Sequence, residues 1–310
     1  MHRLLPVLVV LALNVADHAT GADALQPVRV TDAVYAFIGD AGEIGPSNRG
    51  EVGNAGFIVG RDGVIVVDTG ISARYGQAMI DAIRRITDRP IALVIITHAE
   101  QEFLFGTAAF EPLHAPLLTH ARSTELMRQR CERCLQNLTK LLGADAMAGT
   151  RLVIPERTVE ASTTLDIAGR RIELLHYGWG STPGDLIVYD PASGALFAGG
   201  LVNNRRIPEL RDAHLDGWLR ALRQLDRVGA EVIVPGYGQP GGHELIEATA
   251  RYLRALDDKV TELYGAGASL LDAVDRADLP GYASWTLYPS LHRQNALHRY
   301  LQLELEELGG

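Results

Sequence analysis

The sequence predicts a mixed α/β fold made of two β-sheets with helices outside them, and three observations carry this prediction. Apolar strand-like runs bounded by turn residues alternate with amphipathic helical stretches, and the alternation occurs twice along the chain. The 310 residues are 47% hydrophobic and 22% charged, which are ordinary proportions for a globular protein. No low-complexity linker or short-period repeat interrupts the pattern. We therefore expect one domain over residues 25–242 and a helical C-terminal extension over residues 243–310.

The first half of the chain begins with β-structure and continues with helices and buried strands. Residues 28–40 and 56–68 are predicted as strands, the second range being split by the turn Arg61-Asp62-Gly63. Residues 73–87 are predicted as a helix with one apolar face. Residues 91–97 form a near-continuous apolar run, which is typical of a strand buried on both sides. A loop or short helix, a strand at 116–119 and a long helix at 122–142 follow.

The second half repeats this order. Residues 163–177 read as two strands joined by a turn at 168–170, and residues 186–189 and 195–198 flank a hairpin loop that contains Pro191 and Gly194. A helix is expected over 215–228, then a short buried strand over 231–234. The chain from residue 244 onward is predicted to be mainly helical.

The first 24 residues have the layout of a secretory signal peptide. A positive start at Met1-His2-Arg3 precedes an apolar run over residues 4–15, and small residues follow it. The alternative is an uncleaved membrane anchor, but the run is about 12 residues long whereas a span needs ~20. No later segment is long and apolar enough to cross a bilayer. We expect an exported protein, periplasmic or secreted, cleaved near residues 21–24.

The charge balance excludes one class of partner. The chain has 38 acidic and 29 basic side chains, a formal net charge of -9. A nucleic-acid binder needs a basic face to displace counterions from phosphates. We expect a small molecule or an exported protein as the partner.

Cys131 and Cys134 are the two cysteines of the chain. In an oxidising compartment a pair three residues apart closes a small disulfide, and inert thiols are the other plain interpretation. A redox-active site is a third, although the flanking residues indicate an amphipathic helix rather than a strand-to-helix turn. A zinc site would need further thiols, which the chain does not have.

Chemistry is expected where buried strands give way to loops. Those segments are 66–70, 97–103, 180–185 and 234–238, with 196–201 beside them. Their order and spacing resemble the metallo-β-lactamase superfamily over nearly all of the chain after the signal peptide. That resemblance implies a four-layer αββα sandwich. Further stretches resemble an exported subgroup, the quinoprotein relay system zinc metallohydrolases; they are 47–50, 54–60, 105–110 and 292–295.

The family's chemistry, as the resemblance implies it, rests on two zinc ions that hold a hydroxide. This sequence departs from the family pattern at almost every ligand. His98 matches the first histidine, and Glu102 stands as a carboxylate where the family has an aspartate. The other five ligand positions hold Glu100, Phe103, Ser181, Gly200 and Tyr237. Phenylalanine and glycine side chains cannot bind a metal, so the dinuclear zinc site is expected to be lost.

Three aromatic residues are expected to converge on the vacated cavity, namely Phe103, Trp179 and Tyr237, with Ser181 and Gly200 beside them. A repacked plug is one outcome, because large aromatic side chains in a former cavity restore packing density. An aromatic-walled pocket for a flat organic molecule is the other. His176 is expected to be the only further histidine near the cavity. Asp68 is expected to accept hydrogen bonds from loop amides.

His98, Glu100 and Glu102 leave two interpretations open. If the stretch is extended, the three side chains share one face and could hold a single divalent ion such as zinc, manganese or calcium. In the other interpretation the acids raise the pKa of His98 and keep it protonated, which excludes metal binding. We favour a protein without a cofactor that is a non-catalytic binding or accessory protein, linked to quinone-dependent dehydrogenases through the subgroup resemblance. The alternative is a metallo-β-lactamase-type hydrolase with one metal at these three residues.

Overall fold

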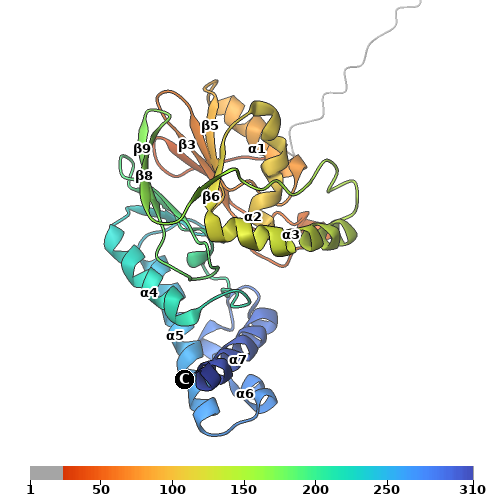
Figure 1. The fold of residues 1–310 in the computed structure, drawn as a ribbon, viewed down its shortest axis with the longest axis vertical. Coiled ribbons are helices and arrows are strands. Elements are labelled where there is room, and N and C mark those ends of the chain that lie inside the picture. The colour runs from red at the N-terminus through yellow and green to blue at the C-terminus, as the bar shows by residue number, and fades with distance from the viewer. Residues whose placement is uncertain (1–23, 310) are drawn as a thin grey trace, which may run out of the picture.

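A computed structural model describes residues 24–309, and the predicted signal peptide lies almost entirely outside this range. Two sheets form its centre (Figure 1). The first has seven strands in sequential order; they are β1 (Val28–Arg29), β2 (Val34–Phe37), β3 (Ala55–Val59), β4 (Val64–Val67), β5 (Ile91–Ile95), β6 (Leu117–His120) and β7 (Arg157–Val159). The strands from β1 to β4 pair antiparallel, and those from β4 to β7 pair parallel.

The second sheet has the order β12-β11-β10-β9-β8. Its strands are β8 (Thr163–Ile167), β9 (Arg170–Leu175), β10 (Ile187–Asp190), β11 (Ala195–Phe197) and β12 (Val232–Val234). Its pairs are antiparallel except β11 with β12, which run parallel because helix α4 (Leu215–Leu225) connects them.

Helices cover the outer faces of both sheets. Helices α1 (Ala73–Ile86) and α3 (Ala121–Leu142) pack on the first sheet through one apolar cluster, with the short α2 (Gln101–Leu104) near them. Helices α4 and α5 (Glu244–Gly265) pack on the second sheet through another cluster. A third cluster lies between the sheets and takes side chains from both. The layers are therefore helix, sheet, sheet and helix, and the predicted αββα fold is confirmed.

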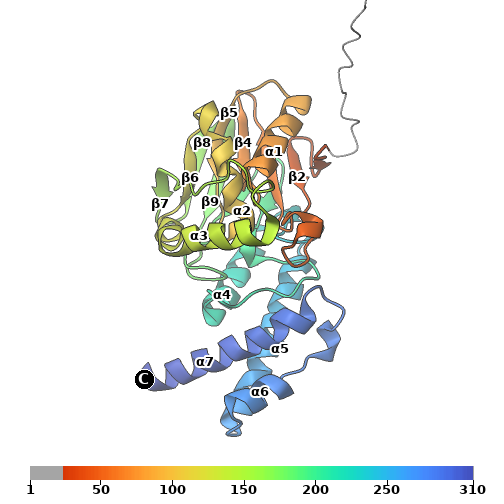
Figure 2. The same cartoon turned by 90° about the vertical axis from the view of Figure 1, so that its right-hand side faces the viewer.

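The C-terminal helices extend this body along its long axis (Figure 2). Helices α6 (Leu270–Arg276) and α7 (Arg293–Gly309) pack against the far part of α5. Most predicted elements are found within two or three residues of the observed bounds. The range 28–40 is shorter in the structure, as β1 and β2 only, and β7 was not predicted because its three residues carry no apolar alternation. Among the described residues no helix is long and apolar enough to cross a membrane.

Candidate functional site

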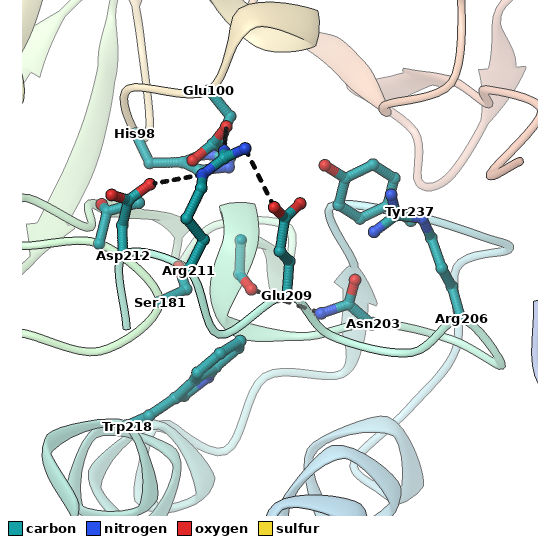
Figure 3. Close-up of a pocket in the computed structure, with 12 residues that line it drawn as sticks. His98, Glu100, Ser181, Asn203, Arg206, Glu209, Arg211, Asp212, Trp218 and Tyr237 are labelled. Atoms are coloured by element: carbon teal, nitrogen blue, oxygen red, sulfur yellow. Dashed lines mark hydrogen bonds and ion pairs between the residues drawn. The ribbon is translucent and has the colours of Figure 1, made fainter. Parts of the chain in front are cut away.

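Loops from both sheets meet at one end of the sandwich and bring five of the predicted positions together, Glu100 among them. His98 follows β5, Ser181 lies between β9 and β10, Gly200 follows β11 and Tyr237 follows β12 (Figure 3). These residues line a cavity of about 30 Å³. A cavity needs roughly 10–15 Å³ to hold one water, so this space is of water size rather than of ligand size. We call it the central site.

His98 is held at the end of β5 by a chain of buried hydrogen bonds. The hydroxyl of Thr97 donates to Asp68 at 2.8 Å, and the Thr97 oxygen lies 2.8 Å from Nδ1 of His98. When Asp68 is ionised it accepts the Thr97 hydroxyl proton, and Nδ1 of His98 then carries the ring proton. Asp68 also accepts from the Thr97 amide, as predicted, and burial raises the pKa of Asp68 to about 8.

The prediction that neighbouring acids keep His98 protonated is wrong. His98 is buried, with 1% of its surface exposed. Burial, with the nearby Arg130 guanidinium, lowers the pKa of His98 to about 3. The acids do not reach the ring, because each of them is turned toward another partner. His98 is therefore a neutral imidazole at ordinary pH.

Glu100 is turned toward two arginines. Its carboxylate oxygens lie 2.8 Å from Arg130 on α3 and 2.9 Å from Arg211 in the loop before α4. Asp212 pairs with both arginines as well, and Glu209 lies 3.1 Å from Arg211 (Figure 3). These five residues form a charge network that joins the first half of the fold to the second.

Glu102 is turned toward an aromatic partner. The hydroxyl of Tyr237 donates to Glu102 at 2.6 Å, and burial followed by the Glu102 charge raises the pKa of Tyr237 well above its usual value. Phe103 packs edge-on against Tyr237 with ring centroids 5.3 Å apart, and its centroid is 4.3 Å from that of His98. The Arg206 guanidinium lies 3.7 Å from the Tyr237 ring centroid, which is a cation–π contact.

The stretch 98–102 is not extended, which corrects the premise of the predicted mononuclear metal site. Glu100 is the residue that caps α2, and Glu102 lies within that helix, so the two acids point in different directions from His98. Among residues 24–309 no group of three or more histidine, cysteine, aspartate or glutamate side chains is arranged to hold a metal ion. The structure does not bring the three predicted ligands together.

Gly200 stands where the resemblance places the family's bridging aspartate, and a side chain there would have to displace Ser181 and His98. A Cβ atom at Gly200 would lie 2.6 Å from Oγ of Ser181 and 2.9 Å from Nε2 of His98. Ser181 donates to Asp185 at 2.8 Å, and burial raises the pKa of Asp185 to about 6. Ser181 thus donates to Asp185 within its own loop. The donors present do not fit a pair of zinc ions.

The sequence did not single out the loop that fills the central site. This loop, residues 203–213, supplies Arg206, Glu209, Arg211 and Asp212. Asn295 of α7 fixes it, because its side chain accepts from the Leu210 amide at 3.0 Å and donates to the Pro208 carbonyl at 2.6 Å. The available signal was the run of five charged residues over 205–212, shortly after the ligand position held by Gly200.

Trp179 does not line the central site, which corrects another prediction. Its side chain is 49% exposed, and Nε1 donates to the Asp212 carbonyl on the outer side of the loop. Trp218 lines the central site instead. His176 also does not line the central site. Its ring stacks instead on that of His120, with ring centroids 3.9 Å apart.

Trp179, His120 and His176 line a second and larger cavity of about 550 Å³, which we call the flank groove. Its other lining residues are Arg122, Glu125, Leu126, Gln129, Glu160 and Pro183. Nδ1 of His120 accepts a hydrogen bond from the Arg122 amide. The buried Nε2 of His120 lies toward the Glu160 backbone and makes no hydrogen bond to the described residues. Burial, followed by the neighbouring His176, lowers the pKa of His120. The groove therefore offers imidazole and indole surfaces to a ligand.

Comparison with known proteins agrees with this fold. The chain is 23% identical over 289 residues to a linear primary-alkylsulfatase of a Pseudomonas strain, covering 80% of this chain and 54% of the relative. It is 27% identical over 120 residues to a type 2 metallo-β-lactamase of Bacteroides fragilis, covering 37% of this chain and 48% of the relative. The chain thus spans about half the length of these two relatives.

A solved structure gives the same result for the fold. A metallo-β-lactamase from Pontibacter korlensis superposes with a TM-score of 0.62 at 22% identity, over 74% of this chain and 99% of that one. The sequence profile of the metallo-β-lactamase superfamily matches residues 48–237, more than half of the chain. With the two sheets and the strand-end loops in the family's order, this chain belongs to the metallo-β-lactamase superfamily.

Proposed function

We propose that this chain is a non-catalytic binding or accessory protein built on the metallo-β-lactamase fold. The observation that carries the proposal is the charge network at the central site. Glu100, which stands at a ligand position, is held between Arg130 and Arg211 at 2.8 and 2.9 Å. A metal ion there would have to displace two guanidinium groups from a carboxylate that they already satisfy.

The remaining ligand positions support the same proposal. Glu102 accepts a 2.6 Å hydrogen bond from Tyr237, and Phe103 and Gly200 have no donor atom. A neutral His98 has one ring-nitrogen lone pair, which is a single ligand where a zinc site needs three or four. The positive charge that zinc supplies in this family is supplied here by arginine side chains.

The flank groove is the surface that we propose for ligand binding. It is large enough for an organic molecule, and the half-exposed Trp179 indole and the stacked imidazoles of His120 and His176 offer flat faces. A planar ring compound is the class of ligand that suits such walls. The alternative hydrolase with one metal at His98, Glu100 and Glu102 has no comparable support, because these side chains diverge.

We further propose that the protein is exported after removal of residues 1–24 and works beside quinone-dependent dehydrogenases, as the subgroup resemblance implies. The N-terminal residue of the protein recovered from the periplasmic fraction or the medium tests the first part. A mature start near residues 22–25 supports export. An intact Met1 in the cell lysate alone contradicts it.

Metal content is the measurement that tests the proposed function. The purified mature protein is dialysed against zinc, manganese and calcium in turn and analysed by elemental mass spectrometry. We expect less than about a tenth of an equivalent of each metal. Functional sites bind too tightly for dialysis to strip them, so such a low metal content would mean that no functional site is present. His98→Ala serves as the site variant, and His243→Ala, on an exposed part of the surface, serves as the matched control.

The opposite outcome is equally clear. About one equivalent of a metal that is lost in His98→Ala and kept in His243→Ala would establish a rebuilt mononuclear site. The hydrolase alternative would then replace the proposal. Metal that both variants keep in equal amount would come from elsewhere on the surface and would leave the central site empty of metal, as proposed.

A further inference from the structure

Cys131 and Cys134 lie one turn apart on helix α3 as free thiols. Residues i and i+3 of an α-helix have Cα atoms about 5 Å apart. This separation falls within the roughly 4.4–6.8 Å that a disulfide requires. The Cβ atoms of residues three apart on a helix lie about 5–6 Å apart, whereas a disulfide requires roughly 3.5–4.5 Å. Closing the pair therefore requires a local tightening of α3, and a bond under such strain is more easily reduced. The predicted disulfide is open in this structure.

The two thiols differ in access and in charge environment. Cys131 is 1% exposed and belongs to the core under the first sheet, whereas Cys134 is only partly buried at the edge of that core. The hydrogen bond with Cys134 and burial both raise the pKa of Cys131. The hydrogen bond from Cys131, assisted by Arg130 and Arg211, lowers the pKa of Cys134 to about 6.

The position of Arg130 gives a geometric reason why the pKa of Cys134 is lower than that of Cys131. Arg130 and Cys134 are four residues apart on α3, so their side chains lie on one face of the helix. The buried Nε of Arg130 has no hydrogen-bond partner among residues 24–309, while its other nitrogens hold Glu100 and Asp212. A thiolate at Cys134 would sit beside a guanidinium that is fixed by the charge network.

We propose that Cys131 and Cys134 form a redox-active dithiol that exchanges electrons with a disulfide-containing partner, with Cys134 as the attacking thiol and Cys131 as the resolving thiol. A partly exposed nucleophile beside a buried partner thiol is the arrangement that such exchange requires. The proposal does not depend on the flank groove or on the absence of metal. Its substrate class is a disulfide of a small molecule or an exported protein.

The exchange balances without any further reactant. The Cys134 thiolate attacks one sulfur of the substrate disulfide, a mixed disulfide forms, and the other substrate sulfur leaves as a thiolate that takes a proton from water. Cys131 then loses its proton to water and attacks the Cys134 sulfur, which closes the Cys131–Cys134 bond and releases the second substrate thiol. The dithiol has lost two electrons and two protons, and the substrate has gained them. The reverse sequence oxidises a dithiol substrate.

The experiment uses the full mature protein, reduced and desalted, with glutathione disulfide as the probe. Thiols are counted by alkylation and intact mass. We expect the wild type to lose both alkylatable thiols together. Cys131→Ala should trap one glutathione on Cys134, and Cys134→Ala should react at least roughly tenfold more slowly at pH 7, because Cys131 is buried and protonated. Thermal unfolding of each variant shows that it is folded.

The pH dependence of the reaction is the second readout. The rate of Cys134 alkylation by iodoacetamide in the wild type should reach half its maximum well below the usual ~8.5 of a free cysteine, and the midpoint should rise in Cys131→Ala. A wild type whose thiols stay reduced in excess glutathione disulfide, or equal rates for the two single variants, would overturn the proposal. A midpoint near the free-cysteine value in the wild type would overturn it as well.

Discussion

Residues of the 176–185 loop line both the central site and the flank groove, and the two cavities have opposite character. The central site holds about 30 Å³ of space, and its acids are paired with arginines or with Tyr237. The flank groove holds about 550 Å³ and presents an indole that is 49% exposed. The acids of the central site are thus paired internally, and the space large enough for an organic molecule is the flank groove.

Filling the position of the family's bridging ligand should have the largest effect. Gly200→Asp places a Cβ atom 2.6 Å from the Ser181 oxygen and an added carboxylate against His98. We expect the free energy of unfolding to fall by about 2–4 kcal/mol. The matched control is Gly281→Asp, since nothing lies within 4 Å of a Cβ there. Urea denaturation of both variants measures the difference, and equal values would mean that the central site is not closely packed.

The protonation of His98 should make the central site sensitive to acid. Its folded-state pKa of about 3 lies below the unfolded value of ~6.5, so the unfolded chain binds more protons between these pH values. The contribution of neutral His98 to the free energy of unfolding is present in full above pH ~6.5. It is lost as the pH falls toward 3, by at most ~1.4 kcal/mol per pH unit. Urea midpoints of the wild type and His98→Gln at pH 6.5, 5.5 and 4.5 measure this slope.

The variant isolates the histidine because Asp68 and Asp185 contribute to both proteins. We expect a shallower decline in His98→Gln than in the wild type. His114→Asn, a change at an exposed histidine with positive φ, is the control and should follow the wild type. Parallel curves for the wild type and His98→Gln would show that the imidazole titrates freely and that the central site is open to water.

Removing one hydroxyl tests the pairing of Glu102. Tyr237→Phe keeps the ring contacts with Phe103 and Arg206 but leaves Glu102 without its 2.6 Å donor. An unpaired buried acceptor costs about 1–3 kcal/mol, and we expect a loss of stability in that range. Tyr35→Phe, at a partly exposed tyrosine of β2, is the control. Thermal unfolding of the two variants decides between a required and a dispensable hydrogen bond.

The smallest effect on stability is expected in the flank groove. Trp179→Ala removes a half-exposed ring and one hydrogen bond, so stability should fall by less than about 1 kcal/mol. Binding should respond strongly. We expect titration with 8-anilinonaphthalene-1-sulfonate, a flat aromatic probe, to give saturable fluorescence that Trp179→Ala abolishes and Tyr237→Phe preserves. The reverse pattern would move the ligand site to the central cavity.

The sequence predicted the fold well because its signals are local. Apolar runs such as residues 91–97 and helical periodicity such as that of residues 73–87 depend on neighbours only a few positions away. The loss of the zinc ligands was equally plain, since a phenylalanine or a glycine cannot bind metal in any conformation. Both conclusions follow from residue type and spacing alone.

The side-chain partners could not be predicted in the same way. Glu100 and Arg211 are 111 residues apart, and Arg130 and Asp212 are 82 apart, so no local pattern couples them. The predicted position of Trp179 was wrong because Gly178, with φ of 92°, turns the chain just before it. Being two residues from Ser181 in the sequence does not determine where a loop side chain points. The direction of Glu100 and Glu102 was wrong because a four-residue helix replaces the assumed extended stretch.

The two hydrogen bonds of Asn295 make the position of the 203–213 loop depend on helix α7. Asn295 and Leu210 are 85 residues apart, so the loop receives this anchor only after helix α7 has docked. The two sheets and their helices involve earlier parts of the chain. The charge network takes Glu209, Arg211 and Asp212 from this loop, so its geometry depends on the docking of α7. A chain in which α7 is undocked would lack the anchor that holds Arg211 and Asp212 where they pair with Glu100 and Arg130.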